Sequence, residues 1–253
     1  MLRELLAEFV FRLSFGLAVA MAWTPATMVS SGFYKVHLWV LLGLNTFGAL
    51  AIASGDYSNR WPLILPVVAG VASYIGAILW MYEWKKAGYA ALYIVALADL
   101  VAALMVTNQG SSDLGNVMLL AQVGSSGMVL GLTMAAMLLG HWYLNSPGMR
   151  LEPFKQLIVL LLVFVVLRSL LCGGGAVSHV ANSIDLGVGW YGLVALRWLS
   201  GLIGIAGLSI MTWQTLKIPN TQSATGILYV AVIFSFLGEL SSQLLATSSS
   251  YPL

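Results

Sequence analysis

Eight apolar runs, each long enough to cross a lipid bilayer, constrain this chain more than any other feature. An α-helix rises 1.5 Å per residue, so about 20 apolar residues span the hydrocarbon core of a membrane. Only 8% of the 253 residues are charged, whereas soluble domains carry about 25%. We therefore expect an all-α fold, a polytopic integral membrane bundle of eight transmembrane helices. The expected helices cover residues 9–29, 34–54, 62–82, 87–107, 116–142, 154–173, 191–214 and 223–246.

Tryptophan positions and short connections agree with this expectation. Tryptophan favours the membrane–water interface because its ring joins an apolar body to an N–H donor. The connections between the runs are too short for a separate soluble domain, so residues 1–253 are expected to form a single transmembrane domain. Six tryptophans fall at the ends of the expected spans: Trp61, Trp80, Trp84, Trp142, Trp190 and Trp213.

The distribution of cations between alternate loops predicts the orientation. The termini and the loops on their side hold Arg3 and Arg60. Cytoplasmic loops are enriched in Lys and Arg, so both termini are expected on the outer side of a bacterial cytoplasmic (inner) membrane. The first run is expected to be retained as a helix bent near Pro25, because Glu4 and Glu8 spoil the basic start of a signal peptide. The expected cytoplasmic loops and span ends hold Lys35, Lys85, Lys86, Arg150, Lys155 and Lys217.

Composition argues against several classes of function. The net charge of +2 is small and scattered, so nucleic acid is not an expected partner. The single cysteine, Cys172, cannot form an internal disulfide and reads as a small buried apolar residue. His, Asp and Glu are too sparse for a multi-ligand metal centre, so no metal site is predicted.

Four charged residues lie inside the expected spans. A charge at the centre of a membrane helix costs at least about 2.5–3.5 kcal/mol, so each one needs a partner or a purpose. On the expected topology all four lie in the outer half of the membrane and their charges sum to zero. One interpretation is a set of structural ion pairs, and the other is a polar pocket suited to a quinone headgroup or a proton path. The four residues are Asp99, Arg168, Arg197 and Glu239.

The last run carries a polar stripe around Glu239. Ser235, Ser242 and Gln243 lie at −4, +3 and +4 from it, which places them on one face of a helix. A carboxylate on such a stripe can exchange a proton with a quinol. The candidate residues are Glu239 and Asp99 for catalysis, and Arg168, Arg197 and Gln243 for quinone binding.

Arg12 is a further candidate for this charged set. Glu8 precedes it by four residues, so the preferred interpretation is a local pair that reaches the membrane interface.

The histidines fall into two groups. His37 opens the second span and His141 closes the fifth, so both are expected near the cytoplasmic face. Two neutral imidazoles on facing helices are the minimum for a b-type haem, although a solvated interfacial histidine is ordinary. His179 is expected in an outer loop over residues 174–190.

Glycine spacing predicts close helix packing. Gly127 and Gly131 form a GxxxG pair in the fifth span, and Gly201, Gly204 and Gly207 recur at three-residue spacing in the seventh. Small residues let helix backbones approach closely in lipid. Neither pattern has the strand context of a nucleotide-binding loop.

The last span, SATGILYVAVIFSFLGELSSQLLA, resembles the membrane-anchor subunits of the polysulfide reductase and dimethyl-sulfoxide reductase group. The resemblance is carried by residues 223–246, above all by Gly238-Glu239, with the eight-helix plan as support. It implies an all-helical, haem-free subunit that passes electrons between quinone and an iron–sulfur partner subunit. His37 and His141 are not part of that pattern.

Four functions remain open from the sequence. The first is a membrane subunit of a respiratory or redox complex that contacts lipid, anchors soluble partners and exchanges electrons with quinone, without independent catalytic power. The second is a structural scaffold within a larger membrane assembly. The third is a b-type haem cytochrome that uses His37 and His141. The fourth is a small transporter, disfavoured because no inverted repeat is visible and only Pro25 and Pro66 interrupt the runs.

Overall fold

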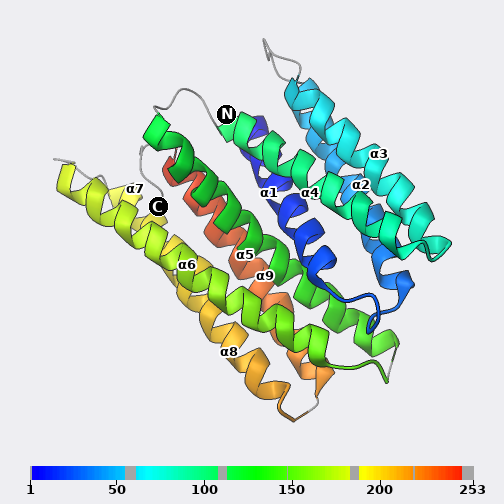
Figure 1. Cartoon of the computed structure of the whole chain (residues 1–253). Coiled ribbons are helices and arrows are strands. Elements are labelled where there is room, and N and C mark those ends of the chain that lie inside the picture. The colour runs from blue at the N-terminus through cyan, green and yellow to red at the C-terminus, as the bar shows by residue number, and fades with distance from the viewer. Residues whose placement is uncertain are drawn as a thin grey trace.

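The computed structural model describes residues 2–54, 61–107, 113–146, 148–182, 188–218 and 220–246. Every regular element in these ranges is helical, and eight of the helices are long and apolar enough to cross a membrane (Figure 1). The expected all-α architecture and helix count are therefore confirmed by length and composition. The helices are α1 (Leu2–Trp23), α2 (Ser31–Ala53), α3 (Trp61–Met81), α4 (Lys85–Thr107), α5 (Asp113–Asn145), α6 (Glu152–Asn182), α7 (Val188–Trp198), η1 (Leu199–Gly204), α8 (Ile205–Thr215) and α9 (Thr221–Ala246).

Helices α1 and α5 form the centre of the bundle. They are the most buried spans, at 72% and 83% of their apolar windows, and they pack on each other. Helices α2 and α4 pack on α1 on one side, with α3 packed against both of them, whereas α6 and α9 pack on α5 on the other (Figure 1). Residues that project from α1 or α5 therefore meet both halves of the molecule.

The contact between α1 and α5 depends on glycine. A Cβ at Gly131 would overlap the backbone of Gly16 and Leu17, and a Cβ at Gly16 would overlap the carbonyl of Gly127. The GxxxG pair of the fifth span thus packs against a glycine of the first. This confirms the packing role expected from its spacing.

The first and sixth spans differ from their expected limits. Helix α1 begins at Leu2 and ends at Trp23, so Pro25 follows the helix and does not bend it, as its fixed φ and missing N–H favour. Helix α6 continues to Asn182 through three glycines that were expected to start a loop. His179 consequently belongs to α6 by its backbone, and its side chain lies outside the described residues.

The seventh span is not a uniform α-helix. Its central residues, Leu199–Gly204, form the π-helical segment η1, which begins two residues after Arg197. A π-helical segment widens the helix and shifts the faces of the residues that follow, and such segments are frequent at functional sites. Gly207, the third glycine of the expected series, faces open space.

Trp80 lies at the end of α3, as its position in the sequence predicts. Its ring is buried and stacks on Tyr34 with centroids 3.9 Å apart. Tyr89 packs edge-on against both rings, and the Tyr34 and Tyr89 hydroxyls donate to the Thr24 carbonyl. Trp80 therefore belongs to an aromatic core at the ends of α1 and α3.

The cations assigned to cytoplasmic loops all lie at one end of the bundle. This is the end where α1, α3, α5 and α8 finish and the next long helices begin (Figure 1). Arg3 lies at the opposite end, where it donates to the Ser54 carbonyl. Arg60 lies outside the described residues. Which end faces the cytoplasm stays a prediction.

Candidate functional site

Arg12 is buried between the two halves of the bundle, on α1. Its guanidinium donates to Glu239 Oε1 of α9 at 2.6 Å and to Ser126 Oγ of α5 at 3.0 Å. It also pairs with Glu8, one turn earlier on α1, and lies 3.4 Å from Thr107 Oγ1 of α4. The expected pair with Glu8 is present, but Arg12 does not reach the interface because α9 and α5 cover it.

Arg168 of α6 approaches Glu239 from the other side. It is fully buried, and its guanidinium lies 3.8 Å from Glu239 Oε2. It donates to the Gln122 carbonyl and to Ser125 Oγ of α5, at 3.0 and 3.3 Å, and to Ser242 Oγ of α9 at 3.2 Å. Helices α5 and α9 thus hold this guanidinium in place, and two members of the expected charged cluster, Arg168 and Glu239, form an ion pair.

Arg197 completes the group from α7. It is 2% exposed, and its guanidinium donates to Cys172 Sγ at 3.6 Å. A Cβ at Gly238 would overlap Gly201, so α9 and η1 cross in backbone contact there. A Cβ at Gly201 would also lie 2.6 Å from Nη1 of Arg197. The glycine crossing therefore brings Arg197 beside Gly238, the neighbour of Glu239.

We call the group of Arg12, Arg168, Arg197 and Glu239 the arginine centre. Its carboxylate is engaged on both oxygens, each by a different arginine. With Glu8 included, three cations face two anions among the described side chains, so one formal positive charge is in excess there. Buried charge of one sign attracts a ligand of the other sign or an electron-rich acceptor.

Several polar atoms of the arginine centre have no hydrogen-bond partner among the described residues. They are the Nε atoms of Arg12, Arg168 and Arg197, together with both polar atoms of the Gln243 side chain. Gln243 is 2% exposed and lies one turn after Glu239 on α9. A buried polar group left unpaired costs about 1–3 kcal/mol. The surplus here consists mostly of donors, and it therefore favours an acceptor ligand.

Ser235 lies on the same face of α9, but among the described residues it forms no hydrogen bond with the arginines. Its hydroxyl donates to the Val232 carbonyl of its own helix at 2.8 Å. Of the expected polar stripe, Ser242 binds Arg168, whereas Gln243 is left unpaired.

Asp99 was expected to join this cluster, and the structure places it elsewhere. It accepts a hydrogen bond from Asn45 Nδ2 of α2 at 3.2 Å, and no ion pair involves it among the described residues. Arg12 meets α4 at Thr107, eight residues beyond Asp99, which is about 12 Å along the helix. Arg12 and Glu8 therefore take the place that the sequence assigned to Asp99.

The sequence itself indicates that Arg12 needs a buried partner. Arg12 lies well inside the apolar part of α1, where a cation needs a partner. The serines of α5 that bind the arginines, Ser125 and Ser126, have no such signal, because serine is common in membrane helices.

The two haem-ligand candidates have different surroundings. His37 is buried, its Nδ1 lies 2.6 Å from the Phe33 carbonyl, and its ring packs against Phe33 and Trp142. His141 is exposed and its Nδ1 lies 3.3 Å from the Tyr229 hydroxyl of α9. Neither ring uses its Nε2 in a hydrogen bond among the described residues. Haem ligation by this pair stays a prediction.

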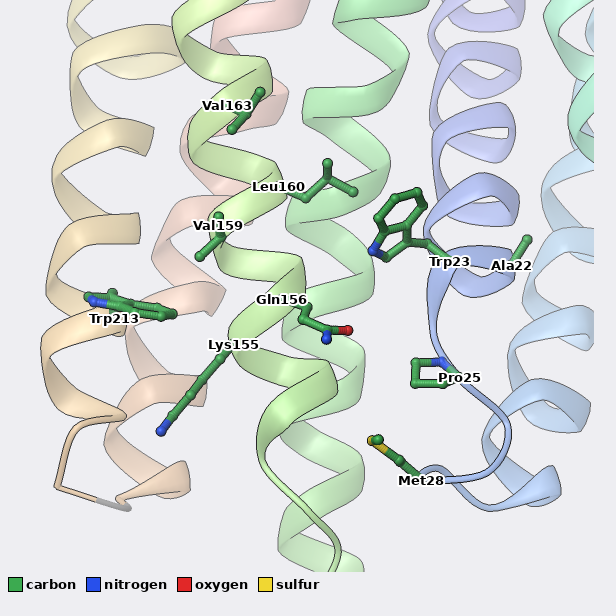
Figure 2. Close-up of a pocket in the computed structure, with 10 residues that line it drawn as sticks. All are labelled: Ala22, Trp23, Pro25, Met28, Lys155, Gln156, Val159, Leu160, Val163 and Trp213. Atoms are coloured by element: carbon green, nitrogen blue, oxygen red, sulfur yellow. The ribbon is translucent and has the colours of Figure 1, made fainter.

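A lateral groove opens on the surface between α1 and α6. It has a volume of about 760 Å³ and lies at the end of the bundle opposite the arginine centre (Figure 2). Trp23, Leu160 and Val163 form apolar walls, whereas Lys155 points toward the end of the bundle. This groove has the character of a lipid-facing surface with a cation at its mouth.

Comparisons with protein-family models, with curated proteins and with solved structures found no match to this chain. The resemblance of residues 223–246 to the reductase membrane anchors therefore rests on those residues alone.

Proposed function

We propose that this chain is a multi-pass protein of the bacterial cytoplasmic membrane, that it serves as the membrane subunit of a redox complex, and that its arginine centre binds the headgroup of a quinone. The observation that carries the proposal is the unpaired donor capacity of three buried arginines and Gln243. A quinone headgroup presents two carbonyl oxygens, which are acceptors only. Its ring is apolar and suits a site within the apolar bundle.

The reduction of a quinone places negative charge on its oxygens before protons arrive. Together with Glu8, the arginine centre has one positive charge in excess among the described side chains, and it lies about 10 Å from the end of α9, counted from Glu239 to Ala246. Fixed cations in a water-poor site stabilise such developing charge strongly. These features support electron exchange with a membrane-soluble carrier.

Glu239 acts in this proposal as a positioning residue. Both of its oxygens are already engaged by Arg12 and Arg168, so it holds the arginines in place. Proton exchange with a quinol at Glu239 stays a prediction, because only Oε1 accepts a hydrogen bond from an arginine, whereas Oε2 lies 3.8 Å from Arg168. The Gly238-Glu239 pair thereby gains a physical meaning: the glycine allows the helix crossing, and the glutamate organises the arginines.

Quinone binding tests the proposal directly. Purified protein in detergent is titrated with a short-chain quinone, and the heat of binding is measured. Gln243→Leu removes an unpaired donor without removing a recorded contact. The loss of hydrogen bonding in a buried site predicts roughly tenfold weaker binding. Gln156→Leu, on the exposed surface of the groove, is the matched control and retains wild-type affinity.

A second candidate function is a structural scaffold. The observation in its favour is that the arginine centre ties five helical segments together through Glu239, the α5 serines and the Gly201–Gly238 crossing. A scaffold predicts no saturable quinone binding and no effect of Gln243→Leu beyond stability. Either result would contradict the quinone proposal.

The subunit assignment has its own test. The redox proposal predicts that affinity-tagged chain, extracted in mild detergent, brings down a soluble partner that contains iron and acid-labile sulfide. Isolation of the chain alone from native membranes, with stoichiometric quinone bound, would remove the iron–sulfur partner from the proposal.

A further inference from the structure

A second buried polar cluster lies between α1, α2 and α4, apart from the arginine centre. Ser14, Asn45 and Asp99 are fully buried. Asn45 Nδ2 donates to Asp99 Oδ2 at 3.2 Å and to the Leu41 carbonyl at 3.1 Å, which uses both of its hydrogens. Three oxygens then remain without a hydrogen-bond partner among the described residues: Ser14 Oγ, Asn45 Oδ1 and Asp99 Oδ1.

Helix register brings Ser14 to the level of Asn45. Phe11 of α1 packs on Gly48 of α2, because a Cβ at Gly48 would overlap the Phe11 ring. The two helices are antiparallel, and the Tyr34 hydroxyl bonded to the Thr24 carbonyl sets the same register further along. Ser14 and Asn45 each lie three residues from that contact, in matching directions, so one helical turn places them on the facing surfaces.

The cluster contains one carboxylate and no recorded cation. Asp99 forms no ion pair among the described residues, and the nearest arginine contact on its helix is at Thr107. The groups recorded against it are neutral. A carboxylate buried without a compensating charge is strongly unfavourable. A bound positive charge removes that penalty.

We propose that Ser14, Asn45 and Asp99 form a binding site for a small dehydrated monovalent cation of the size of sodium. One carboxylate balances a single positive charge, whereas calcium takes 6–8 oxygen ligands and usually several carboxylates. Carboxylate, amide and hydroxyl oxygens are the ligands that hard cations prefer. Sites of this kind within membrane bundles couple ion binding to the arrangement of helices.

The position of Ser14 favours a metal ion over a proton. A hydroxyl close enough to share a proton with Asp99 would donate a hydrogen bond to it, and no such bond is formed. A hard cation about 2.3–2.6 Å from each oxygen holds its ligands farther apart than a hydrogen bond does. The three oxygens therefore make no hydrogen bonds among the described residues and are available as ligands for a cation.

Thermal unfolding of the full chain in detergent tests the site. Sodium chloride is exchanged for choline chloride at constant ionic strength and pH, with potassium chloride as a third series. Ligand that binds only the folded state raises Tm, by about 3–6 °C when sodium is present at roughly ten times its dissociation constant. We expect this shift for the wild type, a smaller shift for Ser14→Ala and none for Asp99→Asn.

Ser209→Ala is the matched control. Ser209 of α8 is also fully buried with an unpaired hydroxyl, but it lies in the other half of the bundle. It is expected to retain the full sodium shift. If Asp99→Asn does not fold, Ser14→Ala against Ser209→Ala still decides the question.

Three outcomes would overturn the proposal. They are equal Tm of the wild type in sodium and choline, a full sodium shift in both Asp99→Asn and Ser14→Ala, and stabilisation by acid without any sodium dependence. The last outcome would show that Asp99 carries a proton in place of a metal ion. None of them bears on quinone binding at the arginine centre, because the two sites share no residue.

Discussion

Two carboxylates in similar sequence surroundings have different roles in this structure. Glu239 and Asp99 are each the only acidic residue in a long apolar helix. Glu239 meets two arginines from other helices, whereas the hydrogen bond that Asp99 forms with another described side chain comes from Asn45. The difference arises from which helix faces each residue. The neighbouring helices therefore decide the charge balance of each site. Glu239 lies beside arginines, whereas Asp99 has no cation beside it among the described residues.

Glu239→Gln is expected to destabilise the protein strongly. The substitution leaves Arg12 and Arg168 buried without the carboxylate that joins them. Breaking a buried ion pair by removing one partner costs about 3–5 kcal/mol. Thermal unfolding in detergent measures the effect as a large fall in Tm. The Gln243→Leu variant, which changes the same face of α9, is the control and keeps a Tm near that of the wild type.

The structural and functional roles of Glu239 can be separated by this pair. A Tm for Glu239→Gln equal to that of Gln243→Leu would show that the arginines do not depend on Glu239. The account of the arginine centre as an organised charge group would then be wrong.

Glycines decide the packing of whole helices at two crossings. Gly16, Gly127 and Gly131 bring α1 onto α5, and Gly201 and Gly238 bring η1 onto α9. Both crossings flank the arginine centre, because Arg12 lies one turn before Gly16 and Glu239 follows Gly238. Close backbone approach is therefore what allows side chains from α1, α6, α7 and α9 to meet.

Gly131→Ala tests the first crossing. A Cβ at Gly131 would overlap the backbone of Gly16, which has no flexible side chain to move aside. We expect the yield of folded, monodisperse protein in detergent to fall several-fold, because overpacking of a close contact costs about 1–3 kcal/mol. Size-exclusion chromatography measures this yield.

Gly124→Ala is the matched control on the same helix. A Cβ at Gly124 meets open space, and alanine favours the helix over glycine. It is expected to leave the yield unchanged or slightly raised. Equal yields for the two variants would contradict the close packing of α1 and α5.

At the scale of the molecule, the helix count follows from sequence because apolar length is a local property. The positions at which the helices begin and end depend less on local sequence. Residues 174–182 are predicted as part of a loop, yet α6 continues through them. The residues of the π-helical segment η1 do not distinguish it from an α-helix. Its two glycines, Gly201 and Gly204, are consistent with close helix packing, which was all that the sequence predicted for them.

The membership of the candidate site was predicted only in part. Arg168, Arg197 and Glu239 follow from the need of buried charges for partners. Arg12 was assigned to the interface because Glu8 offered a local partner, and only the position of α9 shows that Glu239 covers it. Helix neighbours are set by side-chain packing between distant segments, and a single sequence does not contain that information.

The binding of a quinone headgroup at the arginine centre can be tested in the membrane. Photolabelling of the protein in lipid bilayers with a photoreactive quinone analogue, followed by mass spectrometry, locates the headgroup directly. A headgroup bound at the arginine centre gives adducts on α6 near Arg168 and on α9 near Gln243, and Gln243→Leu reduces them severalfold. Adducts confined to the lateral groove, at residues such as Trp23 and Val163, or labelling that excess unlabelled quinone does not compete, would contradict it.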